Sequence, residues 1–162
     1  MLFRSLSRGT NALLQGKGSE GMNGFARLLV NSTVGIFGLF DVASELGFDQ
    51  GDEDFGQTLA VWGVPDGPYV FLPIIGPNTG RDLVGWGVDQ LFYPLWWDLD
   101  DVRLRNSLMA LRAVEYRAAL LPADKVVEEA ALDKYAYLRA AYLQRRHAQI
   151  HDGRPPQAQD VE

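Results

Sequence analysis

Few residues of this sequence have types and spacing that could support chemistry, and its two histidines are the first candidates. His147 and His151 lie four positions apart, which would place two metal ligands on one helix face, but the spacing fixes no acidic third ligand. Arg145 and Arg146 stand beside them, and the helix dipole favours basic residues at a helix C-terminus. A basic helix end in solvent is the preferred interpretation, so we predict no metal site.

Two glycine-rich segments could contact phosphate. Residues 16–21 match G-x-G-x-x-G, but a dinucleotide-binding loop needs a preceding strand, and residues 11–15 have the composition of a helix end. A turn between two helices is the better interpretation. Residues 76–82 offer backbone amides and Arg81 at a helix start, but they lack the lysine of a P-loop. Phosphate contact stays open there, and nucleotide hydrolysis is not supported.

Other catalytic patterns are missing from the sequence. The acidic residues 52–54 could bind a hard cation, but the twelve-residue calcium loop is not present, and helix capping with solvation explains them. No G-x-S-x-G motif occurs, and both histidines lie near the C-terminal end, so a serine nucleophile has no visible base. We therefore predict no enzyme activity and no cofactor.

The composition is that of a folded protein and excludes several function classes. The chain has 162 residues, of which 47% are hydrophobic and 22% charged, enough for one domain with a core. Its net charge of −6 leaves no field to attract a phosphate backbone, so we predict no nucleic-acid partner. It has no cysteine, which excludes disulfides and thiolate chemistry within these residues.

Hydrophobic periodicity predicts helices in the first half of the chain. Residues 21–31 form a helical pattern with Arg27 on its polar side, and residues 39–46 form a short one that stops at a glycine. Asp54 precedes a third helix over residues 55–62, with a glutamine three positions later that fits a capping box. The first two helices would be joined by an apolar elbow.

The segment 64–78 breaks this pattern. It carries four prolines and two glycines, so neither a long helix nor a central strand fits, and we predict an extended apolar loop. Such a loop has to be buried in protein or placed against lipid, because its hydrophobic side chains would otherwise face water together. A helix from Thr79 to about Phe92 is expected to follow.

The second half predicts two further helices. A long amphipathic helix containing Leu104 and Leu108 is expected to end at Pro122, and Asp133 is expected to cap a helix that reaches Ile150. No strand is predicted. The expected fold is all-α, with residues 1–153 as one helical domain and residues 154–162 as a solvated tail.

Membrane contact and core packing are both open for the many aromatic residues. No apolar stretch reaches the roughly 20 residues of a spanning helix. Short apolar segments interrupted by glycine or proline, such as residues 34–40 and 69–75, could still enter one leaflet. These segments coincide with phenylalanines and tryptophans, so an interface at a membrane is as plausible as a core.

Ordered motifs over most of the chain resemble the MlaA family, also called VacJ. The segments that carry the resemblance are Leu14–Gly16, Leu29–Thr33, Gly35, Gly38–Ala43, Glu53–Leu59, Trp62–Val64, Gly67–Tyr69, Leu72–Pro73, Gly76–Pro77, Arg81–Asp82 and Tyr142–Arg146. Together they cover about residues 11–153, and as a set they are specific.

The resemblance implies a non-catalytic lipid-transport protein. It implies helices arranged as a ring or doughnut in the inner leaflet of a Gram-negative outer membrane, with an amphipathic channel and a trimeric porin alongside. Phospholipids that have strayed into the outer leaflet would pass through the channel to a soluble periplasmic lipid carrier, which preserves lipid asymmetry. Family members begin with a signal peptide, a lipobox cysteine and further helices, so we expect this chain to correspond to an N-terminally shortened form.

The matching residues suggest physical roles. The hydrophobic residues beside interrupted backbone are expected to contact lipid, namely Phe37, Leu39, Phe40, Trp62, Phe71, Leu72, Ile74, Ile75, Trp86, Trp96 and Trp97. Three polar residues, Asp41, Arg81 and Asp82, are expected near the channel or in buried ion pairs, with pairing preferred over headgroup contact. The alternative function is a soluble helical adaptor whose apolar loops form a protein interface.

Overall fold

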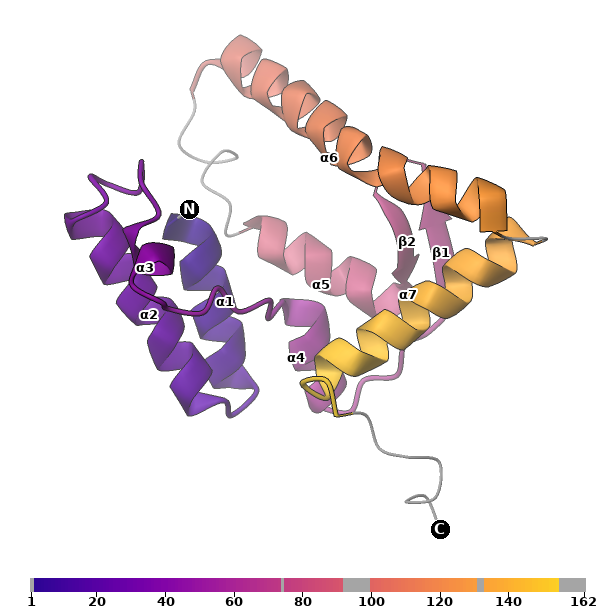
Figure 1. Ribbon diagram of the computed structural model, residues 1–162, viewed down its shortest axis with the longest axis horizontal. Coiled ribbons are helices and arrows are strands. Elements are labelled where there is room, and N and C mark those ends of the chain that lie inside the picture. Colours follow the sequence, from indigo (N-terminus) through magenta and orange to yellow (C-terminus); the bar gives the residue numbers. More distant parts are fainter. Residues whose placement is uncertain (1, 74, 92–99, 131–132, 155–162) are drawn as a thin grey trace. The chain divides into compact units, whose positions relative to one another are not determined.

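The computed structural model describes residues 2–73, 75–91, 100–130 and 133–154, and it is mainly helical (Figure 1). The expected all-α class is therefore correct in its main feature, with one small sheet added. The chain divides into two compact units, one comprising Met1–Pro65 and Arg81–Pro94, the other Asp66–Gly80 and Leu95–Glu162.

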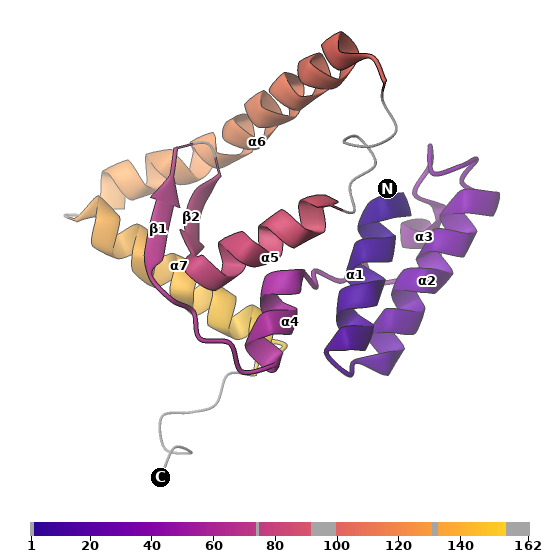
Figure 2. The same cartoon turned by 180° about the vertical axis from the view of Figure 1, so that it is seen from behind.

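Two helices that pack side by side dominate the first unit. They are α1 (Leu2–Leu14) and α2 (Gly18–Thr33), and Figures 1 and 2 show them in contact along their length. A Cβ atom on Gly24 would lie 2.6 Å from the Cα atom of Gly9, so only glycine permits this approach of the two backbones. The short connection at Gly16 confirms the predicted turn between helices.

Three shorter helices complete the first unit: α3 (Val42–Glu45), α4 (Phe55–Val61) and α5 (Gly80–Leu91), most of which belongs to this unit. The Asp54 side chain accepts a hydrogen bond from the backbone nitrogen of Gln57 at 2.8 Å, which confirms the predicted cap of α4.

A polar network centred on Asp89 ties α5 to α1 and α4. The carboxylate of Asp89 accepts hydrogen bonds from Ser7 Oγ at 3.0 Å, from Asn11 Nδ2 at 3.1 Å and from the backbone nitrogen of Phe55 at 3.0 Å. Asn11 in turn accepts a hydrogen bond from Thr58 Oγ1 at 3.1 Å. Burial raises the pKa of Asp89 above its ordinary value, although these hydrogen bonds oppose the shift.

A β-hairpin in the second unit corrects the expected apolar loop. Strands β1 (Tyr69–Leu72) and β2 (Gly76–Thr79) pair antiparallel, with Tyr69 opposite Thr79 and Leu72 opposite Gly76. The prolines argued against a central strand, but in a two-stranded sheet both strands are edges, where a missing N–H is tolerated. The prediction that no strand forms was wrong for this reason.

The long helix α6 (Val102–Ala130) continues through Pro122, where we expected it to end. A proline inside a helix removes one backbone hydrogen bond, and the helix-forming residues after Pro122 sustain the helical backbone in spite of that loss. Helix α7 (Lys134–Ile150) begins as predicted, with the Asp133 side chain accepting a hydrogen bond from Ala136 N at 3.0 Å. The ring of Tyr69 packs edge-on against Tyr135 of α7 at 5.5 Å between centroids.

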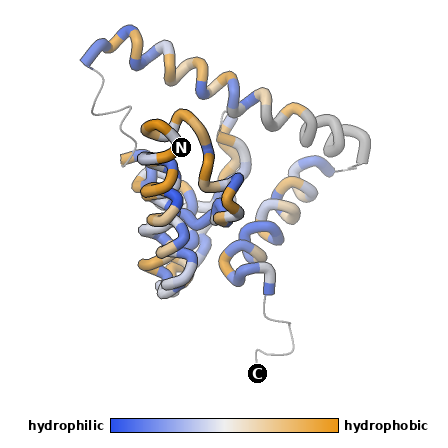
Figure 3. Tube along the Cα trace, turned by 60° about the vertical axis from the view of Figure 1, so that its left-hand side comes forward, coloured by the Kyte–Doolittle hydropathy of each residue, from blue (hydrophilic) through white to orange (hydrophobic). Residues whose placement is uncertain are grey.

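Few of the described hydrophobic side chains of this protein are fully buried. Among the described residues the buried hydrophobic side chains are only Ala12 and Ala43, whereas the largest fully buried side chains are polar: Gln57, Asn31, Thr58 and Thr79. Hydrophobic and hydrophilic residues alternate along the coloured part of α6 in Figure 3. Within the described ranges, no helix combines the length and apolar character needed to cross a bilayer.

Candidate functional site

The most exposed hydrophobic side chains of the first unit lie in the connection between α2 and α3, residues 34–40, called the apolar turn below. Phe37 is 85% exposed, Leu39 76% and Phe40 60%, and Val34 and Ile36 are exposed as well. Contiguous apolar surface of this kind marks contact with lipid or with another protein.

The backbone of the apolar turn is left-handed at three successive residues. The φ angles are 49° at Ile36, 54° at Phe37 and 83° at Gly38. This conformation costs roughly 1–2 kcal/mol at each non-glycine residue, and a β-branched side chain such as that of Ile36 rarely adopts it. It is fastened by backbone hydrogen bonds from Gly38 N to Asn31 O at 2.8 Å and from Phe40 N to Gly35 O at 3.0 Å.

Gly35 has no room for a side chain. A Cβ atom there would lie 2.6 Å from the carbonyl oxygen of Asn31 and would also strike the carbonyl oxygen of Phe40. Both neighbours are backbone atoms, which cannot rotate away, so the turn closes only with glycine at this position.

An ion pair between the buried Arg27 and the half-buried Asp41 joins α2 to the C-terminal end of the apolar turn. Arg27 on α2 is 2% exposed, and its Nη2 atom donates to Asp41 Oδ1 at 2.8 Å and to Oδ2 at 3.0 Å. The same guanidinium donates to Ser44 Oγ at 2.9 Å and to the carbonyl oxygen of Phe48. One arginine thereby connects α2, the start of α3 and the segment that follows it.

The completely buried Asn31 adds hydrogen bonds to the Arg27–Asp41 ion pair. Its Nδ2 atom donates to Asp41 Oδ1 at 3.0 Å, and its Oδ1 atom accepts from Ala43 N at 2.9 Å. Hydrogen bonds from the Ser44 side chain and from Asn31, followed by the charge of Arg27, lower the pKa of Asp41 to about 2. Asp41 is therefore a charged cap of α3 at neutral pH.

The expected place of Arg27 on the polar side of its helix was wrong. The side chain is buried because Asp41, fourteen residues later, caps α3 and provides a matching carboxylate. Periodicity assigned the arginine to solvent because it considers one helix at a time. A lone charge on a mainly apolar helix, followed by an aspartate before a short helix, is the signal that could have revealed the pair.

The predicted lipid-contacting residues differ in exposure. Trp62, Trp86 and Phe71 are exposed, whereas Leu72 and Ile75 in the hairpin segment are half-buried. Trp62 is anchored by a hydrogen bond from its Nε1 atom to the Leu14 carbonyl oxygen at 3.1 Å. Ile74, Trp96 and Trp97 lie outside the described residues, and lipid contact stays a prediction for the whole set.

The predicted polar residues Arg81 and Asp82 form a second buried ion pair. The Nη2 atom of Arg81 lies 3.1 Å from Asp82 Oδ1, and both side chains are almost completely inaccessible. Arg81 also donates to the Val64 carbonyl oxygen at 3.4 Å. Asp41 and this pair thus all have ionic partners, while a role in headgroup contact stays a prediction.

The acidic residues 52–54 are not all explained by capping and solvation. Glu53 is 6% exposed and its Oε1 atom lies 2.8 Å from Lys17 Nζ, so it is a buried partner of a lysine. The sequence alone did not reveal this pair, because the two residues are 36 positions apart, with α2 and α3 between them.

These features define a class of protein: a helical protein in which polar pairs are buried and apolar side chains are presented outward by fixed turns. Comparison with known proteins identifies the family. The sequence model of the family described as MlaA lipoprotein matches residues 3–149, and the chain belongs to this family.

Related sequences agree with this family assignment. The chain is 37% identical over 142 residues to the Escherichia coli protein called "Intermembrane phospholipid transport system lipoprotein MlaA", covering 83% of this chain and 54% of that one. The Haemophilus influenzae protein of the same name is 34% identical over 149 residues, covering 89% and 58%. A Rickettsia typhi protein without assigned function is 36% identical over 129 residues, covering 76% and 49%. The chain thus spans about half the length of these relatives.

A solved structure has the same fold. It was reported as "Structural basis for maintenance of bacterial outer membrane lipid asymmetry", and it superposes with a TM-score of 0.72 at 32% identity, covering 92% of this chain and 75% of that one.

Proposed function

We propose that this chain takes part in phospholipid transport that maintains the lipid asymmetry of a bacterial outer membrane. Its relatives carry the name of a phospholipid transport lipoprotein, and the solved structure concerns outer-membrane lipid asymmetry. The observation that carries the proposal is the exposed apolar turn: Phe37, Leu39 and Phe40 are exposed beside buried polar side chains such as Arg27 and Asn31.

This arrangement suits a lipid path. The exposed side chains of the apolar turn can contact acyl chains. The ion pairs fix the backbone while their charges stay away from the acyl chains. An amphipathic channel lowers the free energy of a polar headgroup passing acyl chains, and no covalent bond is made or broken. The direction of transfer would follow from the affinity of the acceptor for lipid.

The expected surroundings are part of the proposal. We place the protein on the periplasmic side of the outer membrane, beside a trimeric porin, with a soluble periplasmic carrier as the acceptor of phospholipid. A ring-shaped channel in the inner leaflet would let an outer-leaflet phospholipid reach that carrier.

Mass spectrometry of the purified chain tests the proposal. The protein is extracted in a mild detergent and analysed for bound phospholipid, with a water-soluble helical protein treated in the same detergent as the control. We expect phospholipid in near-stoichiometric amount. A lipid-free protein that stays monodisperse without detergent would contradict the proposal and favour a soluble adaptor that uses its apolar surface to bind protein.

A further inference from the structure

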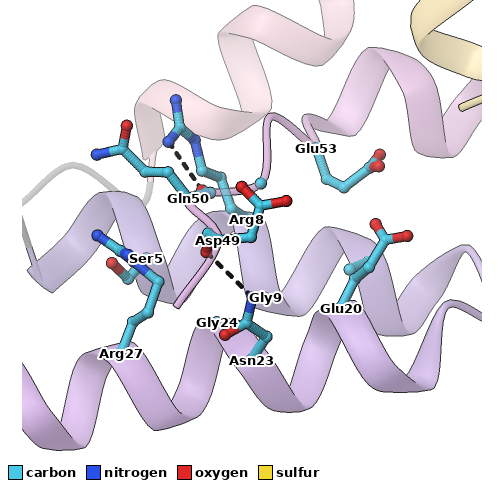
Figure 4. A pocket seen from close by; sticks show the side chains of 12 residues that line it. Ser5, Arg8, Gly9, Glu20, Asn23, Gly24, Arg27, Asp49, Gln50 and Glu53 are labelled. Atoms are coloured by element: carbon cyan, nitrogen blue, oxygen red, sulfur yellow. Dashed lines mark hydrogen bonds between the residues drawn. The ribbon is translucent and has the colours of Figure 1, made fainter. Parts of the chain in front are cut away.

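A polar cavity in the first unit is separate from the apolar turn. It has a volume of about 100 Å³ and lies between α1, α2 and the segment 49–53 (Figure 4). Its lining includes Gly9 and Gly24, where the backbones of the two helices meet closely. A water molecule occupies about 30 Å³ in the liquid, so the cavity has the size of a small polar group and is too small for an acyl chain.

One end of the cavity is acidic. The carboxylates of Glu20 and Glu53 face each other in Figure 4, with oxygen atoms within 4.8 Å. Lys17 neutralises one charge through Glu53 Oε1, but the other oxygen of Glu53, Oε2, is buried without a hydrogen-bond partner among the described residues. An ammonium group that bonds each carboxylate at about 2.8 Å would bridge the pair and satisfy this oxygen.

The other end carries two arginines, and the lining also includes one further carboxylate residue, Asp49. Arg8 and Arg27 line it, and the Nε atom of Arg27 is buried without a hydrogen-bond partner in the described part of the chain. Burial, followed by the charge of Arg4, lowers the pKa of Arg8 below its ordinary value. An anion at this end would stabilise the guanidinium charge and would accept a hydrogen bond from Arg27 Nε–H.

We infer that this cavity binds the phosphoethanolamine headgroup of a phospholipid, with the ammonium between Glu20 and Glu53 and the phosphate at Arg8 and Arg27. The inference rests on the proposed function and adds a lipid class to it. Phosphatidylglycerol has no ammonium for the acidic end. The choline group is larger and has no N–H to donate to a carboxylate, so it fits less well.

Competitive loading of the whole chain tests the inference. The detergent-solubilised protein is incubated with equimolar phosphatidylethanolamine and phosphatidylglycerol of identical acyl chains, and the bound lipids are quantified by mass spectrometry. We expect phosphatidylethanolamine to be enriched about tenfold, the discrimination of one charge-assisted hydrogen bond. Equal loading of the two lipids would overturn the headgroup site while leaving the proposed transport function intact.

Single substitutions connect the preference to the cavity. Glu20→Gln changes an exposed side chain, so it should leave folding intact, and Arg8→Gln removes the basic partner. Glu20→Gln should reduce the enrichment toward one, because it removes an ammonium contact that only phosphatidylethanolamine can make. Arg8→Gln removes a phosphate contact common to both lipids, so it should lower the loading of both. Glu45→Gln, an exposed acidic residue outside the cavity, is the matched control and should keep the preference. An unchanged ratio in the Glu20→Gln variant would contradict the inference.

A titration with the soluble headgroup tests the cavity independently of the transport function. Amide chemical shifts of Asn23 and Gly24 are followed during titration with O-phosphoethanolamine, and with ethanolamine and inorganic phosphate as separate controls. Saturable shifts with O-phosphoethanolamine beyond those of either fragment support the site, even if the chain binds no intact lipid. Shifts with neither the headgroup nor the fragments would mean a water-filled cavity and would overturn the inference.

Discussion

The Nη2 atom of Arg27 lies 2.8 Å from Oδ1 of Asp41, and this ion pair spans the base of the apolar turn. Arg27 is buried and Asp41 is half-buried, while the phenylalanines of the segment between them are exposed. The ion pair thus fixes the position of the exposed apolar turn, and the Arg27–Asp41 pair is called the clamp below.

Removal of the arginine should destabilise the first unit. Arg27→Met leaves Asp41 without its cation, and loss of one partner of a largely buried ion pair is expected to lower the free energy of unfolding by about 3 kcal/mol. Denaturant titration followed by circular dichroism in detergent measures this change. Arg4→Met, at an exposed position of α1, is the control and should change stability by less than about 0.5 kcal/mol. Equal stability of the two variants would contradict the clamp.

Acid should weaken the clamp through Asp41. The folded-state pKa of Asp41 is lowered from its ordinary 3.8 to about 2, so its carboxylate stabilises the fold fully above pH 4. This contribution is lost as the pH falls from about 4 through 2, because the unfolded chain then binds the proton more readily. Unfolding midpoints of the wild type and Asp41→Asn at several pH values measure it. The difference between the two proteins should shrink in that window, and a constant difference would count against the assignment.

Asp89 should have the opposite pH dependence. Burial raises its folded-state pKa, so the charged carboxylate opposes folding at neutral pH and this penalty is relieved as the pH falls through the raised pKa. The Asp89→Asn variant has no carboxyl group at this position that could bind a proton. The wild type should therefore gain stability relative to this variant on acidification from neutral pH, as measured by thermal unfolding. A relative loss would show that the hydrogen bonds from Ser7, Asn11 and Phe55 outweigh burial.

Two glycine substitutions form a matched pair. Gly35→Ala places a methyl group against two carbonyl oxygens and should disrupt the apolar turn, lowering the free energy of unfolding by at least about 2 kcal/mol. In Gly87→Ala the new Cβ meets no atom within 4 Å, and alanine in helix α5 should raise stability by roughly 0.5–1 kcal/mol. Thermal unfolding of both variants tests the pair. Similar losses in both would argue against a steric cause at Gly35.

The apolar turn should contribute to membrane binding. Replacing Phe37, Leu39 and Phe40 together by serine removes three highly exposed hydrophobic side chains without touching the Arg27–Asp41 pair. Liposome partitioning should fall by more than about tenfold, since each exposed side chain contributes roughly 1 kcal/mol or more when buried in hydrocarbon. Flotation through a density gradient measures this.

A conservative triple variant controls for the shape of the turn. Phe37→Leu, Leu39→Ile and Phe40→Leu keep the turn hydrophobic and should retain most of the binding. Unchanged flotation of the serine variant would show that the apolar turn does not contact lipid.

The sequence by itself determined the helical character of the chain and several helix boundaries. Asp54 and Asp133 act as predicted caps, because a cap depends on a side chain and a backbone N–H three residues away. The family resemblance was also carried by sequence, in motifs such as residues 29–33 and 38–43. The interrupted hydrophobic pattern of the apolar turn left core packing and membrane contact both open, and the structure shows its side chains exposed.

The tertiary structure decided the hairpin, the course of α6 through Pro122 and the partners of the buried charges. Strand pairing between residues 69–72 and 76–79 depends on backbone hydrogen bonds across a turn, which side-chain alternation does not report in so short a segment. Arg27 with Asp41, and Lys17 with Glu53, are pairs separated by 14 and 36 residues. Local periodicity assigns charged residues to solvent, and only the folded chain brings a partner close enough to offset the free energy of removing a charge from water.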